Sequence, residues 1–153
     1  MPNTYTKIIF HIVFAVKYRQ ALITPDMKDE LERYITGLFT HRNQKMLIIS
    51  CMPDHVHMLI SYRPVTVLSD LVKEIKVAST NFIKSRFPAC SNFNWQLSYG
   101  CFSCNPYDLD GIFNYIRNQE QRHAKKKFKD EYKELLINNG VEFDEKYFLN
   151  ELE

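Results

Sequence analysis

Two histidines separated by one residue, His55 and His57, lie within an apolar segment of the chain. On a β-strand, residues i and i+2 project from the same face, so the two imidazoles would lie side by side. Imidazole is the commonest side-chain ligand for metals in proteins. The pair is therefore a candidate metal site. A chance pairing on a half-exposed strand is the other interpretation that the spacing allows.

Tyr115 and Gln119 form a second candidate site, in a segment expected to be helical over about 108–124. Side chains four residues apart are neighbours on one side of a helix. The pair flanks an apolar stripe that indicates the face toward the core, made of Leu109, Ile112, Phe113 and Ile116. By spacing alone, such a pair is usually part of an ordinary exposed surface.

Lysines gather on one side of another expected helix, over about 67–87, at Lys73, Lys76 and Lys84. Residues 114–133 add seven basic side chains against three acids. A basic stripe of this kind fits contacts to the phosphates of a nucleic acid, and a solvated helix face is the default interpretation.

The four cysteines include one C-x-x-C pair, Cys101 and Cys104. A structural zinc site needs four ligands, so one pair is a weak signal even if His55 and His57 were to complete it. We expect reduced thiols, because disulfides are rare in the cytosol.

The composition is that of a soluble globular protein, with 45% hydrophobic and 25% charged residues, and its length of 153 residues suits one domain over 1–153. The net charge of +2 is uneven, because residues 139–153 carry five acids and one lysine, which leaves +6 for the rest. A basic body with an acidic tail suits a polyanionic partner. The longest apolar run, 8–16, is too short to span a bilayer, and we expect a cytoplasmic protein.

Hydrophobic periodicity and the positions of the prolines predict strands that alternate with helices. The predicted strands are 6–17, 45–52, 55–62 and 95–102, and the predicted helices are 24–41, 67–87, 108–124 and 128–139. Thr24 and Asp108 are expected to cap the first and third helices. The order βαββαβ, followed by further helices, is that of an α+β, ferredoxin-like (RRM-like) domain with an antiparallel sheet.

In this order and spacing, the motifs resemble a known family. Pro53–Leu59 is similar to the His-hydrophobe-His block of the single-tyrosine HUH transposases, the TnpA-type enzymes of small bacterial insertion sequences. Trp95, Tyr99–Ser103 and Tyr115–Gln119 resemble the segments that lead into the catalytic helix of that family, and Lys17–Arg19 also matches. The resemblance covers nearly the whole chain.

The resemblance implies a DNA transposase in which His55, His57 and Gln119 bind one divalent ion, Mg²⁺ or Mn²⁺. Tyr115 is implied to be the nucleophile that cleaves single-stranded DNA and forms a 5′-phosphotyrosine intermediate. Cys101 and Cys104 stand where the family has small or apolar residues, which argues against a zinc site.

The implied partners are single-stranded DNA with hairpins at the ends of the element and a second copy of the chain. In the homodimer that the resemblance implies, Tyr115 of one subunit would complete the metal site of the other, with 105–108 as the connection that permits the exchange, and the sequence leaves both cis and trans action of Tyr115 open. The family often has paired histidines after the glutamine block, where this chain has Arg122 and His123. The side chains expected to contact DNA are Lys17, Arg19, Lys73, Lys76, Lys84, Arg122 and His123. When acting, the enzyme would be found on the bacterial nucleoid.

Two other functions fit parts of the sequence. A non-catalytic module that binds single-stranded nucleic acid has the same strand order, although the aromatic strand signature of RNA-recognition domains is absent. A domesticated relative that processes chromosomal hairpins would share all four candidate site residues. A two-tyrosine replication initiator is disfavoured, because the expected catalytic helix has one tyrosine.

Overall fold

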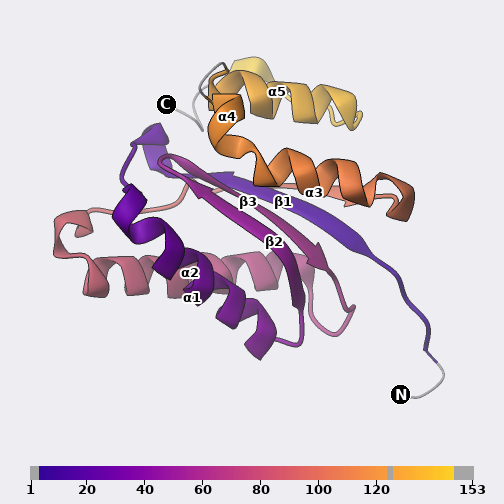
Figure 1. Ribbon diagram of the computed structural model, residues 1–153, viewed down its shortest axis with the longest axis horizontal. Coiled ribbons are helices and arrows are strands. Elements are labelled where there is room, and N and C mark those ends of the chain that lie inside the picture. The colour runs from indigo at the N-terminus through magenta and orange to yellow at the C-terminus, as the bar shows by residue number, and fades with distance from the viewer. Residues whose placement is uncertain (1–3, 124–125, 147–153) are drawn as a thin grey trace.

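The computed structural model describes residues 4–123 and 126–146, and these form one antiparallel sheet with helices on both faces (Figure 1). The strand order is β2-β3-β1-β4, and each neighbouring pair is antiparallel. The strands are β1 (Ile9–Ala15), β2 (Lys45–Met52), β3 (His55–Ser61) and β4 (Gly100–Cys104). The helices are α1 (Pro25–His41), α2 (Leu68–Arg86), α3 (Leu109–Arg117), α4 (Gln119–His123) and α5 (Phe128–Asn138), with short 3-10 turns at Lys17–Arg19, Pro88–Cys90 and Pro106–Asp108. The predicted α+β, ferredoxin-like arrangement is confirmed.

Helices α1 and α2 cover one face of the sheet, and α3, α4 and α5 lie over the other (Figure 1). The alternation along β1 follows from the period of a strand. Ile12 and Phe14 enter the core beneath α1 and α2, whereas Val13 and Ala15 pack against α5. Since β1 is a central strand, every residue from His11 to Ala15 is buried.

The core beneath α1 and α2 is larger than the core between the sheet and α5, and it holds the sheet against those two helices. Phe14 packs edge-on against Trp95, with ring centroids 4.8 Å apart. The indole N–H of Trp95 donates to Ser79 Oγ at 2.9 Å, which satisfies the one polar group of this buried ring. Each large side chain buried here contributes about 2 kcal/mol to stability.

The third predicted helix, 108–124, is in fact two helices that meet at Asn118 (φ −97°, ψ 23°). Asparagine is a poor helix former, and its conformation here turns the chain so that α4 departs from the axis of α3. Ala124 lies outside the described residues. Thr24 and Asp108 occupy the N-cap positions as expected, but neither side chain makes the predicted capping hydrogen bond.

The predicted fourth strand, 95–102, is wrong at its start, because β4 begins at Gly100. Trp95 makes an isolated bridge to Val16, and Gln96 donates its N–H to Ala15 O at 2.9 Å. Residues 97–99 then loop out, with Leu97 90% exposed, before pairing resumes. The first strand is also shorter than the predicted 6–17.

No helix within 4–123 and 126–146 is both long and apolar enough to cross a membrane. Of the predicted acidic tail, residues 147–153 lie outside the described part of the chain.

Candidate active site

His55 and His57 lie on the same face of β3, as their spacing predicts, and this face is turned toward the layer of α3, α4 and α5. Their ring centroids are 5.1 Å apart, and the two residues are 1% and 0% exposed. They stand opposite Ala15 and Val13 of β1. Phe128 of α5 stacks on the His55 ring at 4.0 Å, so the sheet and α5 together hold that imidazole.

Tyr115 and Gln119 reach the same place from α3 and α4. The Tyr115 ring lies 5.8 Å from the ring of His57, and Gln119 Oε1 lies 3.5 Å from His55 Nε2. Across the break at Asn118, Gln119 Nε2 still donates to Tyr115 O at 3.3 Å. The four predicted catalytic and metal-binding residues therefore lie together within one chain.

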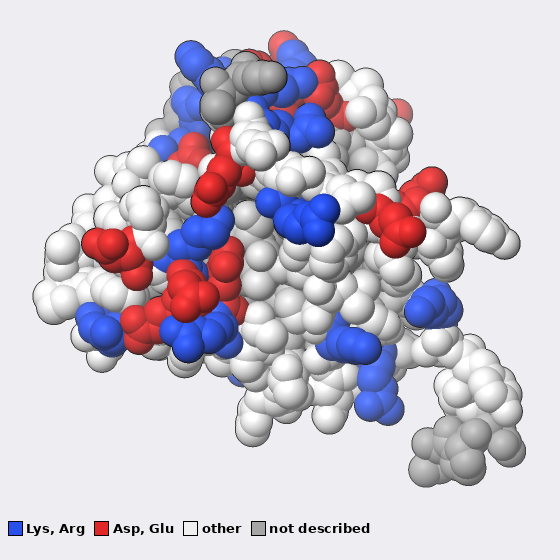
Figure 2. Space-filling model, viewed as in Figure 1, with Lys and Arg blue, Asp and Glu red and all other residues white. Residues whose placement is uncertain are grey.

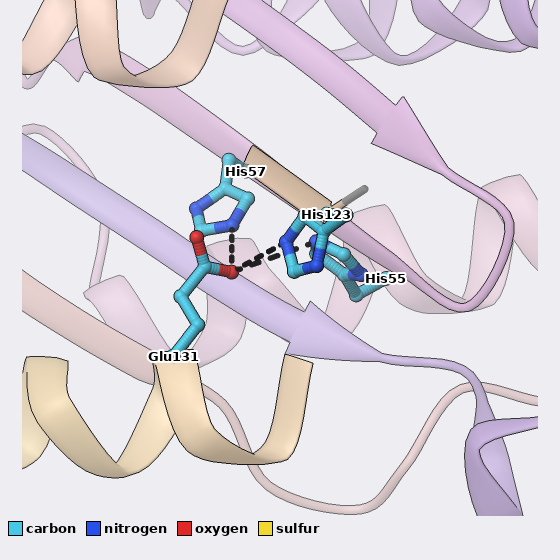
Figure 3. Close-up of side chains that lie close together, drawn as sticks. All are labelled: His55, His57, His123 and Glu131. Carbon is cyan, nitrogen blue, oxygen red and sulfur yellow. Dashed lines mark hydrogen bonds and ion pairs between the residues drawn. The ribbon is translucent and has the colours of Figure 1, made fainter. Parts of the chain in front are cut away.

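Glu131 and His123, neither of them predicted as a ligand, complete the cluster (Figure 3). Glu131 Oε1 accepts hydrogen bonds from His57 Nε2 at 3.0 Å and from His123 Nε2 at 2.9 Å. It also lies 3.8 Å from His55 Nε2. One donor atom from each of these four residues lies within 4.8 Å of the other three.

The second oxygen of Glu131 faces the opposite side of the cluster. The Tyr115 hydroxyl donates to Glu131 Oε2, and Gln119 Nε2 donates to the same oxygen at 3.1 Å. One buried carboxylate thus joins the imidazoles on one side to the phenol and the amide on the other.

Each histidine of β3 is held through its other ring nitrogen. Asp54 Oδ1 lies 2.7 Å from His55 Nδ1, and His11 Nε2 of β1 lies 2.8 Å from His57 Nδ1. Both Nε2 atoms therefore point into the cluster. Partners of this kind orient ligating histidines in metal sites.

The electrostatics of the cluster favour a charged carboxylate and a neutral phenol. Burial alone would raise the pKa of Glu131, but hydrogen bonds from His123 and His57 outweigh burial and lower it. Burial, and then the nearby charge of Glu131, raise the pKa of Tyr115. Burial lowers the pKa of His57 to about 4, so this imidazole is neutral at pH 7, as a ligand must be.

The donor set fits one divalent ion. Ligand atoms bound at about 2.1 Å from a common ion lie roughly 3–4 Å apart, which is the scale of this cluster. Imidazole nitrogens with a carboxylate or amide oxygen suit a first-row ion such as Mn²⁺ better than Mg²⁺. No cysteine belongs to the cluster, within the described residues.

Arg122 and Arg19, two of the expected DNA contacts, lie at the edges of the cluster. The Arg122 guanidinium lies over the Tyr115 ring, 4.2 Å from its centroid. Arg19 lines a cavity of about 980 Å³ that is bordered by His55 and His123 and also includes Lys28. The cavity opens directly from the candidate metal ligands, and it carries cations at its wall.

The lysines of α2 differ from one another. Lys73 and Lys84 are exposed, whereas Lys76 donates to Gln96 O at 2.8 Å and to Ser98 O at 2.7 Å. Lys76 thus ties α2 to the segment before β4. Lys17 lies over the Tyr18 ring, 5.3 Å from its centroid. Charges of both signs are mixed on the face shown in Figure 2, without a continuous basic patch.

Glu131 was not predicted as a site residue, because it lies in a charged run, Lys129–Glu131, that is typical of a solvated helix face. A signal was nevertheless present. Phe128, Glu131 and Tyr132 lie on one stripe of α5, and all three are buried, so an acid interrupts an apolar face. His11 likewise interrupts the apolar run of the first strand.

A same-face histidine pair on a ferredoxin-like sheet, opposed by a helix tyrosine, is the arrangement of the single-tyrosine HUH class. The family model for IS200-like transposases matches residues 4–119, and the chain belongs to that family.

Individual relatives agree with this assignment. The chain is 28% identical to the ISDra2 transposase TnpA of Deinococcus radiodurans over 118 residues, which is 74% of this chain and 84% of the relative. It is 25% identical to the transposase of insertion sequence IS200 from Salmonella typhimurium, over 78% of this chain and 81% of the relative.

Two solved structures share the fold. A crystal structure of a candidate transposase from Deinococcus radiodurans R1 has a TM-score of 0.65 at 27% identity, covering 78% of this chain and 95% of that one. A REP-associated tyrosine transposase bound to a REP hairpin has a TM-score of 0.59 at 20% identity, covering 80% and 73%.

Proposed function

We propose that this transposase cleaves and rejoins single-stranded DNA at the hairpin-marked ends of an insertion sequence, with Tyr115 as the nucleophile. The observation that carries the proposal is the position of the Tyr115 phenol beside His57, in a cluster with the spacing of metal ligands. The hairpin substrate is inferred from family membership, and one structural relative was solved with a REP hairpin.

In the proposed reaction, the Tyr115 oxygen attacks phosphorus and the bond to the 3′ oxygen breaks. The products are a 5′-phosphotyrosine and a free 3′-OH, so one phosphodiester replaces another. A second 3′-OH can reverse the step and join new ends without an external energy source. Attack by water would instead hydrolyse the phosphodiester, and the ends could not be rejoined without an external energy source. A tyrosine nucleophile avoids this loss.

His55, His57 and Gln119 are proposed to hold the divalent ion, Mn²⁺ or Mg²⁺, through His55 Nε2, His57 Nε2 and Gln119 Oε1. Such an ion, when bound, neutralises charge on the scissile phosphate and supplies a positive field near the phenol. The protein must orient Tyr115, and the ring contact with Arg122 contributes to that. Arg19, on the wall of the adjacent cavity, is proposed to contact a phosphate of the strand.

Within one chain, Tyr115 already lies beside His57. We therefore propose that the tyrosine acts in cis, in place of the trans attack that the sequence analysis considered. The proposal is compatible with a homodimer and does not require one.

The test uses single strands from the DNA that flanks the gene, with purified protein and Mn²⁺, on a denaturing gel. A shifted, protease-sensitive band is expected with the wild type and with Tyr107→Phe, and it should vanish with Tyr115→Phe. Tyr107 is a matched control because it is 95% exposed and lies just before the same helix. Tight binding of those strands without any covalent band would instead support the non-catalytic binding module.

A further inference from the structure

We propose that Glu131 is a further ligand of the divalent ion and, at the same time, the residue that positions Tyr115. The inference rests on the proposed function for the role of the ion and of the tyrosine. It adds a helix to the site, because Glu131 lies on α5, beyond the residues 4–119 that the family model matches.

Glu131 Oε1 faces the imidazoles of the cluster. This oxygen lies 3.0 Å from His57 Nε2, 2.9 Å from His123 Nε2 and 3.8 Å from His55 Nε2. It therefore faces the same ring nitrogens that must turn toward an ion. An oxygen in this position is itself a ligand atom, and carboxylates are ligands for Mn²⁺ and Mg²⁺ alike.

The carboxylate of Glu131 is buried among uncharged or weakly basic groups. The Glu131 side chain is 3% exposed, and within the described residues its ion-pair partners are histidines only. Two of these imidazoles, His55 and His57, are fully buried. Burying a carboxylate is costly unless it is paired or coordinates a metal, and no lysine or arginine of the described part of the chain pairs with it. A divalent ion among these donors would place further positive charge directly beside the carboxylate.

The other oxygen, Oε2, accepts hydrogen bonds from the hydroxyl of Tyr115 and the amide of Gln119. The two oxygens of one carboxylate have a fixed separation. An ion bound through Oε1 therefore sets where the phenol oxygen lies relative to the ion. Tyr115 extends from α3, and this contact adds a fixed hydrogen-bond partner to the ring neighbours His57 and Arg122.

The test measures Mn²⁺ affinity of the full chain without DNA, by calorimetry and by the electron paramagnetic resonance signal of free Mn²⁺. Glu131→Gln is expected to weaken Mn²⁺ binding by about 10–100-fold. Glu134→Gln is the matched control, because Glu134 lies on the same helix, is exposed, and pairs with Lys126 outside the cluster. Affinity of Glu131→Gln within twofold of the wild type would overturn the proposal.

A second measurement, the melting temperature with and without Mn²⁺, distinguishes a purely structural role of Glu131 from a ligand role. If the role is purely structural, Glu131→Gln changes the melting temperature of the metal-free protein and leaves Mn²⁺ affinity unchanged. If Glu131 is a ligand, the variant also loses the rise in melting temperature that Mn²⁺ produces. If Glu131→Gln does not fold, Glu131→Asp replaces it. That variant keeps the charge but retracts the carboxylate by one methylene, and the same weakening is expected.

The positioning role is tested with DNA at saturating Mn²⁺. Glu131→Gln is expected to slow formation of the covalent band at least tenfold, with the affinity for the strand unchanged. A normal rate would refute the positioning role. If the wild type forms no covalent band with any flanking strand, the proposed function fails, and the loss of Mn²⁺ affinity in Glu131→Gln still decides the ligand role.

Discussion

His11 Nε2 lies 2.8 Å from His57 Nδ1, so a buried histidine of β1 stands directly behind a candidate metal ligand of β3. A nitrogen that binds an ion carries no proton, so His57 must hold its proton on Nδ1 and donate it to His11 when Nε2 coordinates. The contact serves either tautomer: His11 accepts from Nδ1–H when Nε2 coordinates an ion, and donates to Nδ1 when Nε2 carries the proton that Glu131 accepts.

Replacing His11 should therefore weaken metal binding, although His11 is not itself a proposed ligand of the ion. His11→Leu removes the acceptor, and Mn²⁺ affinity is expected to fall about tenfold. His11→Gln offers an amide oxygen in the same region and should lose less. Calorimetry on both variants checks this, and equal affinities for His11→Leu and the wild type would show that the contact does not orient His57.

Stability should fall as the pH is lowered below about 6.5. Burial lowers the pKa of His57 to about 4 and that of His11 to about 3, each from 6.5. Between these values the unfolded chain binds protons that the folded chain does not, so acid favours unfolding. The loss from His57 alone is on the order of 3 kcal/mol between pH 7 and pH 4. His123, whose pKa the hydrogen bond to Glu131 raises against the effect of burial, acts in the opposite direction.

Urea titrations of the metal-free protein from pH 7 to pH 4 measure this dependence. The variant His11→Gln has one titrating group fewer in the cluster and should show a shallower fall. Stability that rises on acidification would mean that the imidazoles are charged in the folded protein.

The lysines of α2 should separate into two kinds. Lys76→Met loses hydrogen bonds to Gln96 O and Ser98 O and should cost about 1–3 kcal/mol of stability. The double variant Lys73→Ala/Lys84→Ala should keep the wild-type melting temperature and bind single strands more weakly, with a salt dependence reduced by about two counterions. Thermal denaturation and binding at several salt concentrations check both, and full DNA affinity in the double variant would remove these two lysines from the interface.

A mixture of inactive variants tests whether Tyr115 acts in its own chain. Tyr115→Phe lacks the nucleophile and His57→Ala lacks a ligand, so neither forms a covalent band alone. If the tyrosine acts in cis, chains co-expressed and purified together remain inactive. Recovery of the band in the mixture would show that a partner chain supplies the tyrosine.

The sequence predicted the half of the site that depends on short-range spacing. His55 and His57 share a face because a strand has a period of two, and this requires no knowledge of the rest of the chain. Tyr115 and Gln119 remain neighbours even though the helix breaks between them, since the amide of Gln119 bonds back to Tyr115 O.

The other half depends on contacts between distant segments. Glu131 meets His57 across 74 positions of the chain, and His11 meets it across 46. Spacing cannot report such contacts. The error at 95–102 has a local cause, because Trp95 and Gln96 bond to β1 as a strand would before 97–99 loop out.

The dependence of the cluster on α5 has a consequence for how the protein is made. A ribosome synthesises His55 and His57 long before it reaches Glu131. A nascent chain can complete its sheet while the four-residue cluster is still missing a member. Since α5 covers Val13 and Ala15, this part of the sheet stays open to water until that helix docks. The complete cluster therefore forms late in the synthesis of each molecule. A chain truncated before α5 would have the sheet but not the complete cluster.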